Sequence, residues 1–219
     1  MKQIVIFSLL IFGFSACKKD CCCDPKPETK TVTMQPGPAD GNDVTATFHD
    51  GHPESANGNG NSLSELAIFA WTNGGQYVEG KAFISFDLSG IPAGATITSA
   101  NLSLYGVTSS GWNPQGNQGD NAFIVQRVLS SWSENTLTWN NAPATTTAGQ
   151  VTSTNSTSIW NYDVTIPVTN LVQDMINQNT RYGFCLTTTV KSPYRAIVFG
   201  TSEVADAAKR PKLIVTYEH

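Results

Sequence analysis

KAFISFDLSGIPAGATITSANLSLY, residues 81–105, contains two segments of alternating apolar and polar residues joined by a turn. From Ala82 to Leu88 every second residue is apolar, which is typical of a strand with one face in a core and the other in water. Phe83 is the one large apolar residue expected on the wet face. Residues 92–94, Pro-Ala-Gly, favour a turn, and the alternation resumes over residues 100–104. The stretch predicts an antiparallel-type β unit that is covered on one side only.

The remainder of the chain repeats this pattern of short apolar runs between turn-rich loops. We expect further strands at residues 44–48, 63–71, 76–78, 122–129, 181–187, 196–199 and 213–217. Residues 145–158, almost wholly Thr, Ser, Gly and Asn, predict a loop or a weak edge strand.

One segment has helical spacing instead. Apolar residues recur at intervals of three and four between Val168 and Ile176, which predicts a short helix that starts near Asp163 and can be capped by Thr169 or Asn170. Roughly eight to ten strands with one helix predict an all-β fold, a jelly-roll-like β-sandwich with one short crossing helix.

The composition fits a single domain with many turns. The chain has 219 residues, of which 14% are charged, and contains 18 glycines and 11 prolines, so a second globular domain does not fit. The formal net charge of −4 argues against nucleic-acid binding, which normally needs a basic face, and against electrostatic binding to a membrane.

The N-terminus has the features of a secretion signal. Residues 1–16 begin with a positive charge, continue with an apolar run too short to span a bilayer, and end in small residues. Residues 14–17, Phe-Ser-Ala-Cys, resemble a bacterial lipobox with Phe at the position usually held by Leu, so we expect Cys17 to be lipidated. The alternative is an ordinary cleaved signal peptide. Residues 17–39 predict a flexible tether, in which the role of Cys21, Cys22 and Cys23 stays open.

A catalytic role has little support in the sequence. Trp132 and Trp139 flank Glu134, a combination that glycosidases use, but hydrolysis needs two facing carboxylates, and we expect both rings to pack beneath the sheet. No Gly-x-Ser-x-Gly elbow is present. A polysaccharide lyase could use Tyr182 or the Tyr194-Arg195 pair, yet the other lyase motifs are missing. We therefore predict that the chain is not an enzyme.

Aromatic and basic residues in polar segments suggest a sugar-binding surface instead. The rings can lie against pyranose faces, and basic side chains can pair with uronic-acid carboxylates. The candidates are Trp112, Tyr194, Arg195, Lys191, Trp71 and Trp160, although each tryptophan could equally plug the open end of a sandwich. Trp112 stands out because nothing apolar in its neighbourhood would bury it.

No cofactor is certain, but a structural calcium ion is one expectation. Loop carboxylates at irregular spacing suit calcium, and the candidate ligands are Asp40, Asp43, Asp50 and Asp120. The alternative is that these are solvated loop aspartates.

Three motifs in order carry a resemblance to a known family. FDLSGIPAGATITSANLSLY at residues 86–105, WSENTLTWNNAP at 132–143 and RPKLIVTY at 210–217 resemble the DNRLRE domain, also described as the carbohydrate-binding module family 96 type. The resemblance covers roughly residues 40–219. It implies a jelly-roll-like β-sandwich on secreted or surface proteins that holds polysaccharides and has no catalytic residues.

Together these observations predict a non-catalytic polysaccharide-binding module displayed on the cell envelope. We expect a membrane-anchored lipoprotein on the outer membrane or cell surface. Its expected partner is a polysaccharide, which would be acidic if the basic residues pair with it. The membrane would be contacted through the lipid anchor only, and no nucleic acid would bind. The alternative is a structural or adhesive surface protein without glycan specificity. The sequence leaves the glycan and the oligomeric state open.

Overall fold

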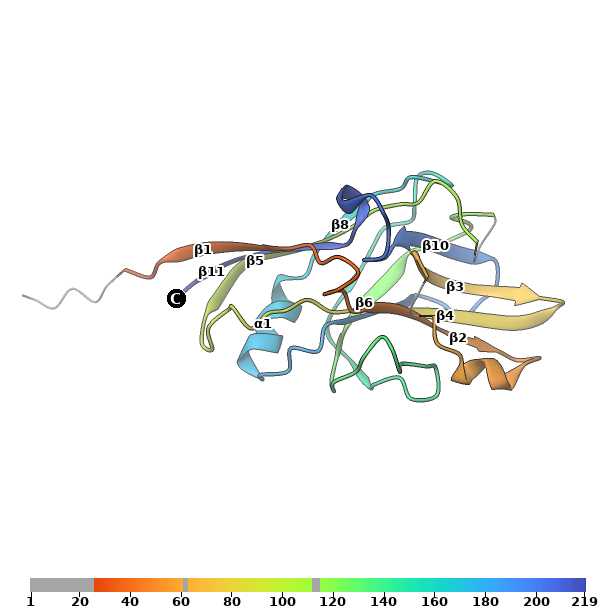
Figure 1. Ribbon diagram of the computed structural model, residues 1–219, viewed down its shortest axis with the longest axis horizontal. Helices are drawn as coiled ribbons and strands as arrows, with labels where there is room; N and C mark the ends of the chain where they lie inside the picture. Colours follow the sequence, from red (N-terminus) through yellow and green to blue (C-terminus); the bar gives the residue numbers. More distant parts are fainter. Residues whose placement is uncertain (1–25, 61–62, 112–114) are drawn as a thin grey trace, which may run out of the picture.

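The computed structural model describes residues 26–60, 63–111 and 115–219, and within them eleven strands form two sheets (Figure 1). Sheet A has the order β1-β11-β5-β8, with bounds Thr29–Met34, Lys212–Glu218, Thr96–Leu104 and Val164–Pro167. Sheet B has the order β10-β3-β4-β9-β6-β7, with bounds Arg195–Gly200, Glu65–Asn73, Gln76–Ile84, Phe184–Thr188, Phe123–Val128 and Thr145–Thr152. Strand β2, Asp43–His49, also pairs with β4 in sheet B. The predicted all-β sandwich is confirmed.

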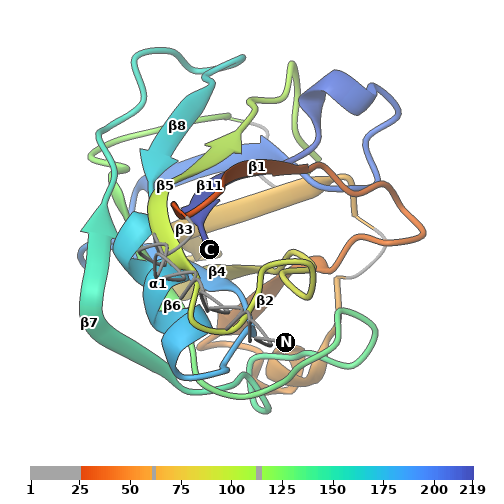
Figure 2. The same ribbon diagram turned by 90° about the vertical axis from the view of Figure 1, so that its left-hand side faces the viewer.

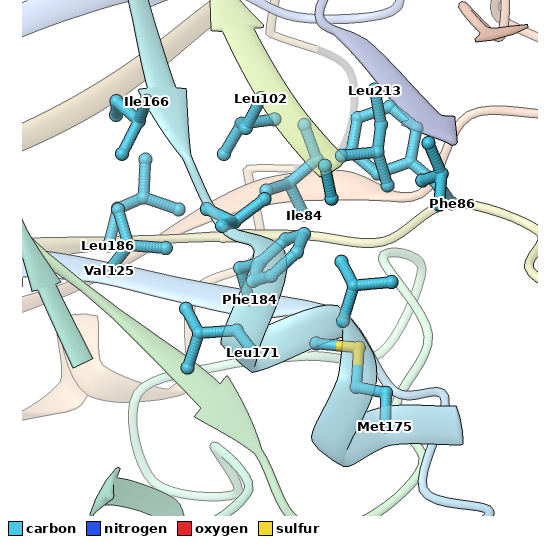
Figure 3. Close-up of a cluster of buried hydrophobic side chains, with 14 of the residues drawn as sticks. Ile84, Phe86, Leu102, Val125, Ile166, Leu171, Met175, Phe184, Leu186 and Leu213 are labelled. Carbon is cyan, nitrogen blue, oxygen red and sulfur yellow. The ribbon is translucent and has the colours of Figure 1, made fainter. Parts of the chain in front are cut away.

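The core lies between the two sheets. Ile84 and Phe184 from sheet B meet Leu102 and Leu213 from sheet A, and all four are almost fully buried (Figure 3). Helix α1, Thr169–Asn177, adds Leu171 and other apolar residues to the same cluster. The helix lies at the end of the sandwich where the C-terminus is found, as Figure 2 shows.

The stretch at residues 81–105 crosses from one sheet to the other. Its first strand, β4, ends at Ile84, and its second, β5, belongs to sheet A, so the two do not form a hairpin. Phe86 and Leu88 lie in the connection, yet both are buried in the core, as the alternation indicated. Arg181 holds the connection by donating hydrogen bonds to the Leu88 and Ile91 carbonyls at 2.7 and 3.0 Å.

The expectation that this strand is covered on one side only is wrong. Phe83 is 1% exposed and belongs to a second apolar cluster on the outer face of sheet B, the face turned away from the core. Leu137 joins it, and Trp132 and Trp139 are half-buried against it. The segment 129–144 therefore forms a cover over part of this face, and the apolar residue on the supposedly wet side contacts that cover.

Two boundaries also differ from the predictions. Strand β1 lies inside the expected tether of residues 17–39 and pairs with β11 from Thr29↔Glu218 to Met34↔Leu213, so the domain begins before residue 40. Helix α1 starts at Thr169, because residues 164–167 form β8 and pair with β5. The Thr169 hydroxyl accepts a hydrogen bond from the Ala100 amide and does not cap the helix. Strand β7 is an edge strand, as one alternative had it.

Several expectations concern residues outside the described ranges. They are the signal peptide, the lipidation of Cys17, the role of Cys21 to Cys23, and the sugar-binding role of Trp112. In the described part of the chain, none of the helices has the length and apolar character needed to cross a bilayer.

Candidate functional site

The outer face of sheet B carries a groove of about 510 Å³, which we call the sheet B groove. It lies beside the end of the covering segment, where Trp139 is. The lining residues are Ala46, Lys81, Phe83, Gln126, Trp139, Ala142, Pro143, Ala144, Thr145, Cys185, Thr187, Thr188, Thr189 and Lys191.

Strand alternation brings these side chains to one face. On β4, Lys81 and Phe83 alternate with residues that face the core. Directly paired residues of antiparallel strands share a face, and the partners of these two are Ala46 on β2 and Cys185 on β9. Gln126 on β6 is paired in turn with Cys185. Ala46, Phe83 and Cys185 are at most 2% exposed, so they form the floor of the groove.

Trp139 forms an aromatic wall of the sheet B groove. Its ring stacks on Phe48 with centroids 5.6 Å apart and an interplanar angle of 29°. The Lys81 ammonium lies 4.3 Å from the ring centroid, a cation–π contact. The neighbouring turn is fixed because Asn141 accepts from the Thr138 amide and donates to the Thr136 carbonyl. The ring is therefore held in place before any ligand arrives, which lowers the entropy cost of binding.

The Gln126 side chain adds hydrogen-bonding capacity to the same groove. The Gln126 amide donates to Gln150 at 2.9 Å and accepts from the Thr145 hydroxyl at 2.7 Å, so its orientation is fixed. Thr188, in contrast, is paired with the core residue Phe123, so its buried hydroxyl, which has no partner among the described residues, lies on the core face of β9 and not in the groove.

Lys191 lines the groove and also contacts a second group of residues. Its ammonium lies 3.0 Å from Glu79, whose side chain is 2% exposed while that of Lys191 is 67% exposed. Tyr77 donates to the same Glu79 oxygen at 3.3 Å. Burial, followed by the Glu79 carboxylate, raises the pKa of Tyr77 to about 12. Lys191 thus presents a cation whose position is set by a buried carboxylate.

Trp71 and Tyr194 form an aromatic pair beside Lys191. Their rings meet edge to face with centroids 5.4 Å apart. Tyr194 is 61% exposed and has a φ of +68°, a conformation that costs energy for a residue other than glycine. Both the exposure of this large ring and its backbone conformation are energetically unfavourable. Unfavourable features of this kind are often found at binding sites.

The structure brings together four of the predicted sugar-binding residues, Trp71, Lys191, Tyr194 and Arg195, but Arg195 is used internally. Its guanidinium donates to the Ser192 carbonyl at 2.7 Å and to the Asp120 carbonyl at 3.1 Å, and its side chain is 13% exposed. Arg195 therefore ties the turn that carries Tyr194 to the loop before β6.

Replacing Arg195 with methionine should lower the free energy of unfolding by about 1–2 kcal/mol, because two carbonyls lose a charged donor. Urea denaturation measures this loss. Lys209→Met is a control that removes a surface ion pair with Asp163 and should cost less than about 1 kcal/mol. Unchanged stability together with lost glycan binding would instead assign the Arg195 guanidinium to the ligand.

Trp160 lies apart from these residues. It is half-buried beside Ile159 and Gly116 and lines no part of the sheet B groove. Its role as a sugar platform stays a prediction.

The four candidate calcium ligands have different surroundings. Asp40 and Asp50 are exposed on separate turns, and Asp120 lies 3.9 Å from the Arg195 guanidinium. Asp43 is buried and accepts the Ser202 amide at 3.1 Å. Over the described ranges, no three His, Cys, Asp or Glu side chains are grouped so that they could hold a metal ion. Calcium binding at these aspartates stays a prediction.

Asp43 belongs to a cluster of three carboxylates, which we call the carboxylate cluster. Glu134 accepts the Asp43 amide at 3.1 Å, and Glu203 accepts the Ser202 hydroxyl at 3.1 Å. Burial, followed by the charge of Glu203, raises the pKa of Asp43 to about 7, and burial also raises the pKa of Glu134. None of the three lines the sheet B groove. The cluster ties the start of β2 to the covering segment and to the turn after β10.

Cys185 is a buried filler residue and not a nucleophile. It is 2% exposed in the floor of the groove, and burial raises the pKa of its thiol to about 12. The thiol is therefore protonated near neutral pH and is a poor nucleophile.

Sequence reasoning missed much of the sheet B groove. Lys81 and Gln126 lie in strands and carry no local signal of binding, and Trp139 was expected beneath the sheet. The one available signal was the WSENTLTWNNAP motif together with Phe83. A tryptophan-rich segment and an outward-facing apolar residue both have apolar surface to bury, and each can be buried by packing on the other.

Comparison with known proteins gave one family. A family model described as carbohydrate-binding module family 96 matches residues 47–217. No match was found among curated proteins.

Proposed function

Because the chain belongs to carbohydrate-binding module family 96, we propose that it is a non-catalytic module that binds a polysaccharide along the sheet B groove. The observation that carries this proposal is the fixed Trp139 ring with Lys81 and Lys191 in one groove. Because Phe48 stacks on the indole and the Lys81 ammonium lies over its ring, a pyranose would stack there by displacing Lys81, which would then be available to the sugar, and the sugar hydroxyls would reach Gln126.

The charge of the groove favours an acidic polysaccharide. The chain has a net charge of −4, yet the charged residues in the lining are Lys81 and Lys191. Carboxylate groups on successive sugars could each meet an ammonium, and the local positive field would speed their approach. Uronic-acid chains therefore fit this groove better than neutral ones.

The site is proposed to extend beyond the groove. Lys191 lies both in the groove lining and beside the buried Glu79, in the turn that carries Tyr194. A chain that leaves the groove past Lys191 would meet the Trp71–Tyr194 pair, whose exposed tyrosine offers a further stacking surface. Several weak contacts of this kind suit a polymer better than a single sugar.

We further propose that Cys17 carries a lipid and holds the domain on the cell envelope. The support is the lipobox-like segment at residues 14–17, which ends in that cysteine. Anchoring many copies on one surface would raise the effective concentration of weak sites and so strengthen polymer binding.

Replacing Lys191 with methionine tests the acidic specificity. We expect roughly a fivefold to tenfold lower affinity of the full chain for a uronic-acid polysaccharide, and a weaker salt dependence, because one ammonium is lost. Affinity electrophoresis at several salt concentrations, with a neutral polysaccharide in parallel, measures both quantities.

Lys30→Met is the matched control, because Lys30 is also an exposed lysine paired with a glutamate but lies on β1 in sheet A. The Lys30→Met variant should bind the uronic-acid polysaccharide with the same affinity and the same salt dependence as the unchanged chain. If the folded chain bound neither class of polysaccharide, the glycan proposal would fail and the structural or adhesive role would take its place.

A further inference from the structure

A second cavity, of about 430 Å³, lies next to β2. Thr45, Thr47 and His49 line it, whereas Ala46 lines the sheet B groove. Alternate residues of a strand point to opposite faces, so β2 separates the two sites. The short helix η1, Pro53–Asn57, contributes Ser55 and lies beside β2 in Figure 1. We call this the β2–η1 cavity.

Two hydroxyl groups of the lining residues are unsatisfied. Thr47 Oγ1 and Ser55 Oγ are buried and have no hydrogen-bond partner in the described part of the chain. Thr45 shows the contrast, because its hydroxyl accepts from the Ala67 amide at 2.9 Å and donates to the Ala67 carbonyl. Buried hydroxyls without partners destabilise a fold, and they persist where a bound molecule completes them.

His49 adds an imidazole whose tautomer is set by a hydrogen bond. Its Nδ1 accepts the Gly51 amide at 3.0 Å, so the neutral ring carries its proton on Nε2. The ring is 9% exposed and is packed edge-on against His52, with centroids 4.8 Å apart. The imidazole is thus held in one tautomer and one orientation, as ligand-binding groups usually are.

The remaining lining defines the chemistry of the ligand. No Asp, Glu, Lys or Arg is among the described residues that line the cavity, so it offers no counter-charge to an ion. Leu63 and Val78 supply apolar surface. A cavity of this size falls in the range of small-molecule sites, which is roughly 300–1,000 Å³. Hydroxyl groups beside aliphatic surface match a molecule with hydroxyls on one side and C–H groups on the other.

We propose that the β2–η1 cavity is a second ligand site, which binds a neutral polyhydroxylated molecule the size of one sugar unit. Thr47 and Ser55 exchange hydrogen bonds with its hydroxyls, and Leu63 and Val78 contact its C–H face. The site is independent of the sheet B groove, which binds an acidic chain on the other side of β2.

Saturation-transfer NMR and calorimetry of the full chain test this inference, with glucose, galactose, mannose, N-acetylglucosamine and glycerol as probes. We expect at least one to bind, and Thr47→Val to weaken it about tenfold, since one buried hydrogen bond is lost. Ser55→Ala is a second variant with the same expectation. Without the probe, both variants should unfold at the same temperature as the original chain or higher, because each removes an unpaired hydroxyl.

Thr188→Val is the matched control, because its hydroxyl is likewise buried and unpaired among the described residues but lies on β9, outside the cavity. It should leave sugar binding in the β2–η1 cavity unchanged, and Thr47→Val should leave binding of the acidic polysaccharide unchanged. The proposal is overturned if none of the probes binds, or if binding survives both Thr47→Val and Ser55→Ala. Neither result bears on the groove.

Discussion

The Trp139→Ala variant should lose most of the affinity of the chain for an acidic polysaccharide. Trp139 is the aromatic wall of the sheet B groove and is held by Phe48 and by the Lys81 ammonium. A central aromatic residue of a binding site typically carries about 2 kcal/mol or more, which corresponds to roughly a 30-fold weaker affinity. Isothermal titration calorimetry with a uronic-acid oligosaccharide measures the change.

Two controls separate binding from folding in that experiment. Circular dichroism shows whether the variant keeps its fold, since Trp139 also packs against the outer cluster. Trp160→Ala removes a half-buried tryptophan that does not line the groove. If Trp160→Ala weakened binding and Trp139→Ala did not, the site would lie near residues 159–160, as the sequence alone also allowed.

The stability of the chain should fall as the pH rises from about 4 to 7. Burial, followed by the charge of Glu203, raises the pKa of Asp43 from its usual 3.8 to about 7. In this interval the folded chain holds a proton on Asp43 that the unfolded chain has released, so raising the pH favours unfolding. The full effect is on the order of 4 kcal/mol, given about 1.4 kcal/mol for each unit of a pKa shift from 3.8 to about 7.

Asp43→Asn should remove this dependence and be the more stable chain at pH 8. The asparagine oxygen can still accept the Ser202 amide, while the buried charge beside Glu134 and Glu203 is gone. Differential scanning calorimetry between pH 4 and 8 gives the comparison. Asp87→Asn is the control, because hydrogen bonds from Ser89 lower the pKa of that exposed carboxyl, and the variant should keep the original slope. A melting temperature that rises from pH 4 to 7 would refute this account of Asp43.

The fold class could be predicted because its signals are local. Alternation over residues 82–88 gave the burial of Phe86 and Leu88 correctly, although the strand itself stops at Ile84. What covers Phe83 could not be predicted, because the cover comes from Leu137 and its neighbours, more than fifty positions further along the chain. A strand shows which residues point outward but not whether a later segment packs on them.

The same limit explains what was missed at the ends of the domain. Strand β1 reads Thr-Lys-Thr-Val-Thr-Met, in which only Val32 and Met34 are partly buried, and it lies next to prolines and lysines typical of a linker. Its pairing with β11 supplies the stability that its own sequence does not. Helix α1 was placed correctly by its apolar spacing, and only its start was wrong.

The proposed binding surface was half predictable. Trp71, Lys191 and Tyr194 were proposed from residue type, and the structure brings them together around Glu79. Arg195 was proposed in the same way, yet carbonyl oxygens occupy its guanidinium. Residue type indicates which side chains can bind a sugar. Hydrogen bonds within the fold decide which of these side chains still have donors or acceptors available for a ligand.

The central claim is that the sheet B groove is the polysaccharide site. The most direct test is a ¹H–¹⁵N NMR titration of the full chain with a short uronic-acid oligosaccharide. We predict that the largest shifts are those of the Trp139 indole and of the amides of Lys81, Thr188 and Lys191, with smaller shifts around Tyr194. Shifts confined to sheet A, or no shifts from a folded chain at millimolar oligosaccharide, would contradict the claim.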